Sequence, residues 1–249
     1  MTFRDLFSER ASLYSKYRPD YPRELFAWVA GMVDKHDIVW DCATGSGQAA
    51  RGLADFFERV IATDASPQQI GQAAPNAAIE YGVATASESR LADGSVNMVT
   101  VAQAMHWLDL EAFYTEVRRV TAPGGALVIW GYGDPIMETD QLEAIVRAYN
   151  RGTIEKYWMP ERTTLLNGYA DIPFPFREIA TPVFNLGCRW TLPELAGYMR
   201  TWSATANYVK QRGSDPVTAV ETALAEHWGG NDNRRLVRWP LYVRAGYTN

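Results

Sequence analysis

Between residues 38 and 130 the chain repeats one pattern, a short apolar segment followed by a polar or glycine-containing turn and then a helical periodicity. The apolar segments are rich in β-branched residues and too short for helices, so we expect strands. Mostly apolar strands of this kind are typical of parallel sheets, which are covered on both faces. The predicted strands are residues 38–41, 60–64, 79–83, 98–103 and 126–130.

Helices are predicted between these strands from apolar residues at helical spacing. The clearest starts are Ser66, which forms a capping box with Gln69 around Pro67, and Asp109. Upstream, a helix opens at Pro22 and should pack on the sheet. Downstream, residues 142–149 are expected to form another helix.

Two further strands are predicted at residues 179–188, interrupted by Pro182, and 235–247, which contains Pro240. Because proline has no N–H to donate to a ladder, both segments are expected at sheet edges or bulges. Four arginines then fall on the solvated face of an edge strand, namely Arg234, Arg235, Arg238 and Arg244.

Residues 190–232 lie between these two strands and are too many for a bare loop. Thr191 and Glu194 form a capping box, and Asp215 starts a second helix that ends at Gly229. We therefore expect a helical lid inserted before the last strand of a single domain, residues 1–249.

Composition narrows the class of protein. The chain has 249 residues, 47% of them apolar, enough for one core plus a subdomain. Its net charge of −5 disfavours nucleic acid as the main partner. No apolar segment has membrane-spanning length and the first residues do not resemble a signal peptide, so we expect a cytoplasmic protein. Cys42 and Cys188 fall in predicted strands, which indicates buried thiols, with no disulfide or metal site.

Residues 39–48 lead from a strand through a glycine turn into a helix. Gly45 and Gly47 allow a ligand to approach the backbone closely, and the helix N-terminus suits a carboxylate or phosphate. Asp64 follows the next strand, where a carboxylate can accept both hydroxyl protons of a ribose. With Ala50 the turn also satisfies the dinucleotide pattern, so a nicotinamide-dependent oxidoreductase stays open.

Asp41, just before the turn, helps to distinguish a nicotinamide dinucleotide from a nucleoside that bears an amino acid. A carboxylate there would repel a pyrophosphate but can pair with the amino group of an amino-acid-bearing nucleoside. This favours S-adenosylmethionine. The alternative is an acid that caps the turn.

The segment resembles the first motif of class I methyltransferases, which use S-adenosylmethionine, and further resemblances follow in order from 38 to 130. Asp64 matches the acid after the second strand, residues 86–88 the turn that borders adenine, and residues 123–125 the turn before the fifth strand. The resemblance, to methyltransferases of type 11, implies a doubly wound, Rossmann-like seven-stranded α/β sheet, mostly parallel with an antiparallel last strand. Two positions depart from the family pattern: Ala43 stands where many relatives have the first glycine of the turn, and Asn97 stands where an acid often begins the fourth strand. An alanine at position 43 is tolerated if its φ is negative.

Residues 17–22, His106, Trp107 and residues 200–204 resemble the trans-aconitate methyltransferase-like branch. That resemblance implies a small-molecule acceptor, with O-methylation of a carboxylate as one candidate reaction. Methylation of RNA or protein would need an extended basic groove. A binding protein that keeps the fold without its chemistry also stays open.

The resemblance also assigns roles in cofactor binding. Asp41 and the turn with Ala43, Gly45 and Gly47 would hold the methionine half, and Gln103 would face it. Asp64 would bind the ribose and the Ala65 backbone the adenine edge. Ser87 and Glu88 would border the adenine, and an N-terminal arm, residues 1–21, would close over the cofactor through Tyr14 and Arg18.

Methyl transfer from a sulfonium chiefly requires an acceptor held in line with the methyl group and protected from water. His106 is a candidate general base for a phenol or amine acceptor, or a packed structural residue. The candidate aromatic walls of the substrate pocket are Trp107, Tyr198 and Trp202, with core packing as the alternative role. Arg200 or Arg18 could clamp a substrate carboxylate, with a surface or structural ion pair as the alternative. A monomer or a homodimer, with no metal and no membrane or nucleic-acid partner, is expected.

Overall fold

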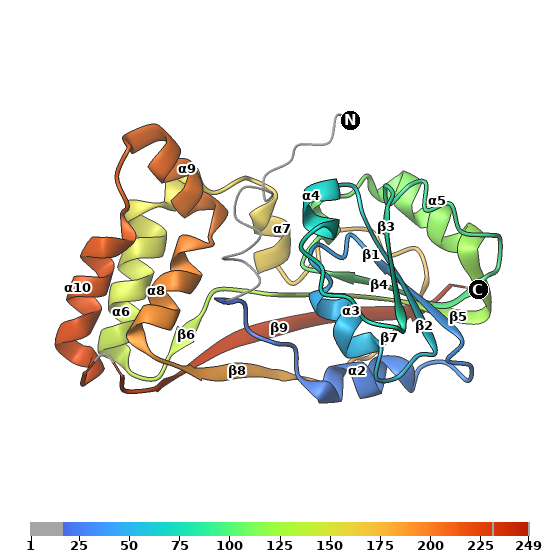
Figure 1. Cartoon of the computed structure of the whole chain (residues 1–249), viewed down its shortest axis with the longest axis horizontal. Coiled ribbons are helices and arrows are strands. Elements are labelled where there is room, and N and C mark those ends of the chain that lie inside the picture. Colours follow the sequence, from blue (N-terminus) through green and yellow to red (C-terminus); the bar gives the residue numbers. More distant parts are fainter. Residues whose placement is uncertain (1–16, 231, 249) are drawn as a thin grey trace.

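The computed structural model describes residues 17–230 and 232–248 of the chain. Its parallel strands are ordered β3-β2-β1-β4-β5, so the chain winds outward in two directions from β1 (Figure 1). They comprise β1 (Ile38–Cys42), β2 (Arg59–Asp64), β3 (Ile79–Val83), β4 (Val96–Ala102) and β5 (Thr121–Tyr132). All five predicted parallel strands are confirmed, with boundaries that differ most at the start of β5.

The last strand, β9 (Arg235–Tyr247), runs antiparallel to β5 along its C-terminal half, and β7 (Arg177–Ile179) pairs with its other side. These seven strands confirm the doubly wound, mostly parallel α/β sheet. The N-terminal half of β9 continues beyond it and pairs with β6 (Ile136–Met137) and β8 (Asn185–Trp190).

The prediction that 235–247 is an edge strand is therefore wrong, because β9 has neighbours on both sides. Pro240 is tolerated where β9 passes from β6 to β5, and its carbonyl accepts the Gly133 N–H at 3.0 Å. The arginines do not form one solvated face, since three of them are in ion pairs: Arg234 with Glu194, Arg235 with Glu138 and Arg244 with Glu178. Pro182 does lie in a break, between β7 and β8.

Helices cover both faces of the sheet. On one face lie α2 (Arg23–Ala30) and α3 (Gln48–Leu53); on the other lies α5 (Leu110–Val120), whose N-cap Asp109 accepts the Ala112 N–H. Successive side chains of β1 point to opposite faces of the sheet: Val39 packs with α2 and α3, whereas Trp40 packs with α5. The helix that begins at Pro67 is short, α4 (Pro67–Ile70), and Ser66 caps it.

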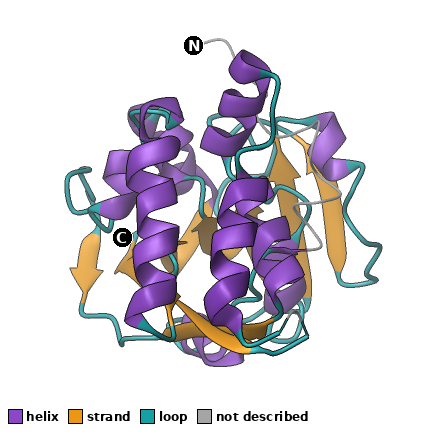
Figure 2. Ribbon diagram, turned by 90° about the vertical axis from the view of Figure 1, so that its left-hand side faces the viewer, coloured by secondary structure: helices purple, strands orange, loops and turns teal. Residues whose placement is uncertain are grey.

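A helical subdomain lies at the far end of β9 (Figures 1 and 2). Its helices are α6 (Asp140–Ala148), η3 (Tyr149–Thr153), η4 (Glu155–Tyr157), α8 (Leu192–Arg200), α9 (Ser203–Arg212) and α10 (Val217–Trp228). The short helix α7 (Arg162–Leu166) packs instead on the main sheet, where Leu165 belongs to the same core as α5. The predicted capping box at Thr191 opens α8, and Gly229 ends α10 in a left-handed conformation. Residues 190–232 supply only part of this unit, because α6 shares its core with α8 and α10.

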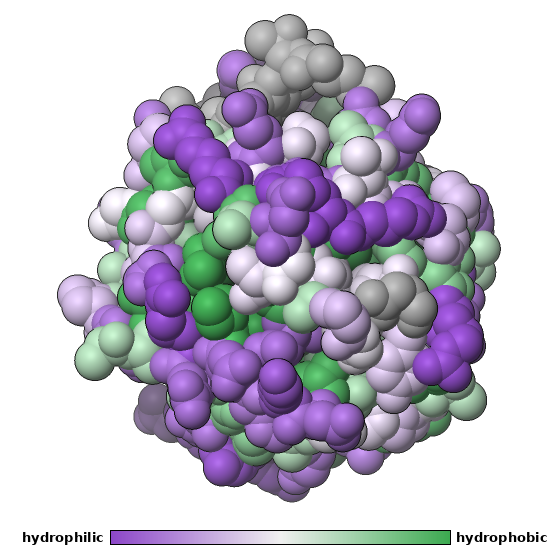
Figure 3. All heavy atoms as spheres, turned by 90° about the vertical axis from the view of Figure 1, so that its right-hand side faces the viewer, coloured by the Kyte–Doolittle hydropathy of each residue, from purple (hydrophilic) through white to green (hydrophobic). Residues whose placement is uncertain are grey.

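Among the described residues, no helix is long and apolar enough to cross a membrane. Figure 3 shows the face at the α5 end as mostly hydrophilic, with hydrophobic residues in separate patches. Both cysteines are free; Cys42 is buried and Cys188 is partly buried.

Candidate active site

The glycine turn connects β1 to α3 at the carboxyl edge of the sheet. Its backbone is left-handed at Ala43 (φ 55°), Gly45 (φ 60°) and Gly47 (φ 81°). The condition of a negative φ at Ala43 is therefore not met, because the turn places this alanine in the left-handed region that favours glycine. At Gly47 a side chain is also excluded by space, because a Cβ would lie 2.4 Å from the Tyr81 hydroxyl oxygen.

Asp41 is completely buried beneath this turn. Its carboxylate accepts hydrogen bonds from the hydroxyls of Thr44 at 2.5 Å and Thr100 at 2.8 Å. Burial raises the pKa of Asp41 to about 6, although both hydroxyls oppose the shift. The structure thus favours the turn-capping role for Asp41 over the direct contact with a cofactor amino group that we expected.

Asp64 ends β2 and is partly exposed beside the turn. One carboxylate oxygen accepts the Gly45 N–H at 2.9 Å and the other accepts the Ser66 N–H at 2.8 Å. These bonds fix the orientation of the carboxylate, the type of acceptor that suits ribose hydroxyls. Ala65, also partly exposed, follows directly.

The loop after β3 places Ser87 and Glu88 on the surface. The next residue, Ser89, is buried and donates its N–H (2.8 Å) and its hydroxyl (2.5 Å) to the Glu116 carboxylate of α5. Arg119 donates to the same carboxylate and to the Leu91 carbonyl. This network anchors the loop that the family resemblance assigns to adenine.

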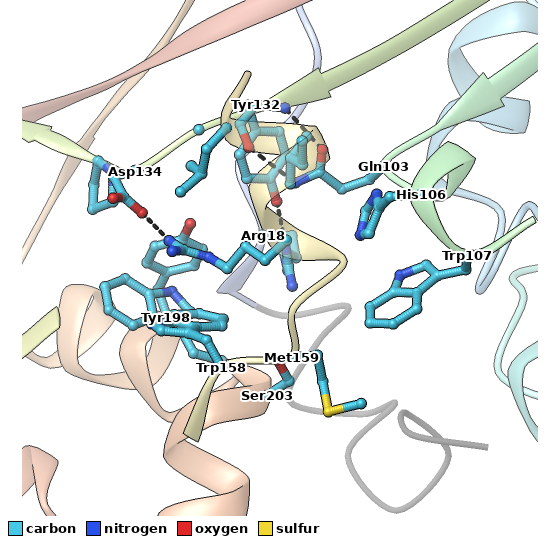
Figure 4. Close-up of a pocket in the computed structure, with 16 residues that line it drawn as sticks. Arg18, Gln103, His106, Trp107, Tyr132, Asp134, Trp158, Met159, Tyr198 and Ser203 are labelled. Carbon is cyan, nitrogen blue, oxygen red and sulfur yellow. Dashed lines mark hydrogen bonds and ion pairs between the residues drawn. The ribbon is translucent and has the colours of Figure 1, made fainter. Parts of the chain in front are cut away.

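A cavity opens where β4 and β5 end, between the sheet and the helical subdomain (Figure 4). Gln103, at φ 59°, turns its amide toward Tyr132, accepting the Tyr132 N–H at 2.8 Å and donating to its carbonyl at 3.2 Å. Arg18 donates to the Tyr132 hydroxyl. Gln103 and Arg18 both line the cavity, as do Trp107, Tyr198 and Trp202.

The described end of the N-terminal arm, residues 17–21, connects the turn to this cavity. Gln48, in the first position of α3, donates to the Pro19 carbonyl at 2.7 Å, and the preceding Arg18 lines the cavity. Tyr14 lies outside the described residues.

His106 lines the cavity and its ring stacks on Tyr169, with Nδ1 3.3 Å from the Tyr169 hydroxyl oxygen. Burial, and secondarily the charge of Arg162, lower the pKa of His106 to about 4. The imidazole is therefore neutral at pH 7. With a pKa this low it is a weak base, and so a poor general base for a phenol or amine acceptor.

Arg200 must be removed from the candidate substrate residues. Its guanidinium pairs with Asp215 at 2.7 Å and with Glu221 at 2.9 Å, and the residue is not among those that line the cavity. The structure adds cavity residues that the sequence reading missed, among them Tyr132, Asp134, Trp158 and Arg162. No motif marked them, because they follow β5 or lie in short helical turns.

The residues present fit a nucleoside bearing an amino acid. The left-handed turn is partly exposed at Gly45, where a Cβ would meet only the Gln69 side chain, at 3.8 Å. Asp64 offers acceptors for paired hydroxyls beside it. Among the described residues, no group of histidine, cysteine or acidic side chains is arranged to hold a metal ion.

Comparison with known proteins identifies the family. The family model described as "Methyltransferase domain" matches residues 40–129. A putative methyltransferase of Dictyostelium discoideum is 32% identical over 97% of this chain and 94% of its own length. An uncharacterized methyltransferase of Mycobacterium tuberculosis is 35% identical over 51% of this chain and 53% of its own length.

Among solved structures, a putative type II methyltransferase from Anaeromyxobacter dehalogenans superposes with a TM-score of 0.87 at 38% identity, over 93% of this chain and 98% of that one. The chain belongs to the class I methyltransferase family and is an enzyme of that family. The resemblance of its sequence to this family is thereby confirmed; the narrower trans-aconitate branch stays a prediction.

Proposed function

We propose that this enzyme transfers the methyl group of S-adenosylmethionine to a carboxylate oxygen of a small molecule bound in the cavity. The observation that carries the proposal is the cavity itself, which adjoins the carboxyl ends of β4 and β5 and contains Arg18, a neutral His106 and aromatic walls. S-adenosylmethionine supplies an electrophilic methyl group on a sulfonium. A carboxylate attacks it without prior deprotonation, so this acceptor suits a cavity whose histidine is a poor base.

In this mechanism the protein chiefly binds and orients. The backbone around Gly45 and the Asp64 carboxylate would hold the cofactor, while the loop with Ser87 and Glu88 would border its base. Arg18 would orient the acceptor carboxylate by a charge-assisted hydrogen bond from its guanidinium. Trp107, Tyr198 and Trp202 would form apolar walls that exclude water from the reacting atoms.

Calorimetric titration tests the cofactor. S-adenosylhomocysteine should bind the wild type, and Asp64→Ala should weaken that binding at least tenfold, about 1.4 kcal/mol, by removing the ribose acceptor. Asp55→Ala is the matched control, because Asp55 lies on the surface in an ion pair with Arg23. Binding of NADH in place of the adenosyl ligand would overturn the proposal.

The reaction is tested by incubating enzyme and S-adenosylmethionine with trans-aconitate and other small carboxylic acids, followed by mass spectrometry. A methylated product that mild alkali hydrolyses is an ester, as the proposal requires. An alkali-stable methylated phenol or amine from parallel incubations, with no ester from any acid, would contradict the carboxylate acceptor and leave the cofactor assignment intact.

A further inference from the structure

We propose that Arg162 is the residue that selects anionic acceptors in this cavity, and that Asp134 regulates how strongly it does so. The inference rests on the proposed function only for the view that the cavity holds the acceptor. It assigns a role to a residue that carries no family motif and was not apparent from the sequence.

The position of Arg162 is built by its neighbours. It opens α7, and its guanidinium carbon lies 3.8 Å from the centroid of the Trp158 ring. The side chain is only 16% exposed and lines the cavity together with Trp158. Stacking on an indole holds the guanidinium plane in place and leaves its N–H edges directed outward, which is the geometry that binds carboxylates in a bidentate way.

The charges around Arg162 are not balanced. Its guanidinium donates to Asp134, an ion pair drawn in Figure 4, but the same carboxylate also pairs with Arg151 at 3.5 Å. Among the described residues that line the cavity, Asp134 is the only carboxylate. His106 contributes no positive charge at pH 7, and burial lowers the pKa of Arg162 itself.

This imbalance favours an anionic ligand. A buried cation that shares its carboxylate with a second arginine is incompletely compensated, and an incoming anion supplies the missing charge and hydrogen-bond acceptors. Asp134 competes with such an anion for the Arg162 guanidinium. Removing Arg162 should therefore weaken anion binding, and neutralising Asp134 should strengthen it.

The test measures binding, so it does not depend on turnover. The probes are trans-aconitate, glutarate and benzoate, each compared with its neutral methyl ester, titrated calorimetrically with and without S-adenosylhomocysteine. Wild-type protein should bind at least one carboxylate more tightly than its ester. Arg162→Gln should weaken that carboxylate at least tenfold, Arg162→Lys should restore part of the loss, and Asp134→Asn should tighten binding.

Arg200→Gln is the matched control, because Arg200 is a partly buried arginine with two carboxylate partners that does not line the cavity. It should leave carboxylate binding unchanged. S-adenosylhomocysteine affinity and the thermal unfolding midpoint, measured on every variant, separate a local effect from loss of the fold; if Arg162→Gln does not fold, Arg162→Lys and Asp134→Asn still decide.

The inference is overturned if the wild type binds no carboxylate in preference to its ester, if Arg162→Gln or Arg162→Lys binds it as the wild type does, or if Asp134→Asn weakens it. Failure of S-adenosylhomocysteine to bind, with the anion results as expected, would overturn the proposed function alone. The two failures are therefore distinguishable.

Discussion

Ala43 has a left-handed backbone, φ 55°, in the turn between β1 and α3. A residue with a Cβ has a steric cost in this conformation that glycine avoids. Glycine also makes the unfolded chain more flexible, but we expect the relief of the steric cost to be larger, so Ala43→Gly should stabilise the protein by about 1 kcal/mol. Urea unfolding measures the difference. Ala27→Gly, at an exposed helical position of α2, is the control and should destabilise by about 1 kcal/mol. The same sign for both variants would contradict the argument.

His106 provides a second prediction at this scale. Its folded pKa, about 4, is below the ordinary value of 6.5, so its contribution to stability is present above pH 6.5 and is lost as the pH falls toward 4. Nuclear magnetic resonance titration should show the ring still neutral at pH 5.5.

The same shift makes a catalytic prediction for the variant His106→Asn. With a carboxylate acceptor this variant should reduce kcat by less than about tenfold, because the reaction needs no general base. Loss of a true general base would reduce kcat by a factor of about 10² to 10⁴. A loss in that larger range, together with a rate that falls below pH 6.5, would restore the general-base role.

At the scale of elements, Glu116 connects α5 to the loop that follows β3. Hydrogen bonds from Arg119 first, and from Ser89, lower its pKa to about 2 against desolvation that opposes the shift. A depressed carboxyl pKa stabilises the fold above the unfolded value of 4.5 and loses that contribution as the pH falls toward 2. Glu116→Gln should therefore lower the unfolding midpoint at pH 7, with a difference from wild type that shrinks below pH 4.5.

Thermal unfolding between pH 7 and 3 checks this prediction, and Glu111→Gln, an exposed position in the first turn of the same helix, is the control. Because Glu116 anchors Ser89, the variant should also bind S-adenosylhomocysteine more weakly. An equal pH response in Glu111→Gln would show that the effect belongs to overall charge.

The elements that the sequence predicts well are those marked by a β-rich segment between turns or by a local cap. β3 and β9 have the predicted boundaries, and the Thr191 capping box opens α8. Helical structure at residues 150–166 was not predicted, because η3, η4 and α7 are too short for a periodic pattern. Arg162 lies in that segment, so no pattern in the sequence marked it as a candidate, whereas Asp64 and Gly45 were predicted from a motif.

At the scale of the whole molecule, β9 joins two packed units. Its C-terminal half completes the main sheet beside β5, and its N-terminal half forms a ladder with β8 beneath the helical subdomain. Leu241 packs against the hydrophobic cores of both units. The cavity lies between the same two units. The position of its walls relative to the glycine turn therefore depends on this shared strand.

Trp239 tests that coupling. It is 2% exposed, donates to the Tyr198 hydroxyl at 3.0 Å, and contacts the rings of Tyr132 and Trp190. Trp239→Ala should cost about 3–5 kcal/mol and still leave one cooperative transition, since a strand common to both units cannot melt in one alone. Leu236→Ala, at a half-buried position of the same strand, should cost less. Circular dichroism and tryptophan fluorescence should report the same midpoint. Two separate midpoints, with S-adenosylhomocysteine binding retained between them, would show that the two units unfold independently. In that case β9 does not couple the cavity to the glycine turn.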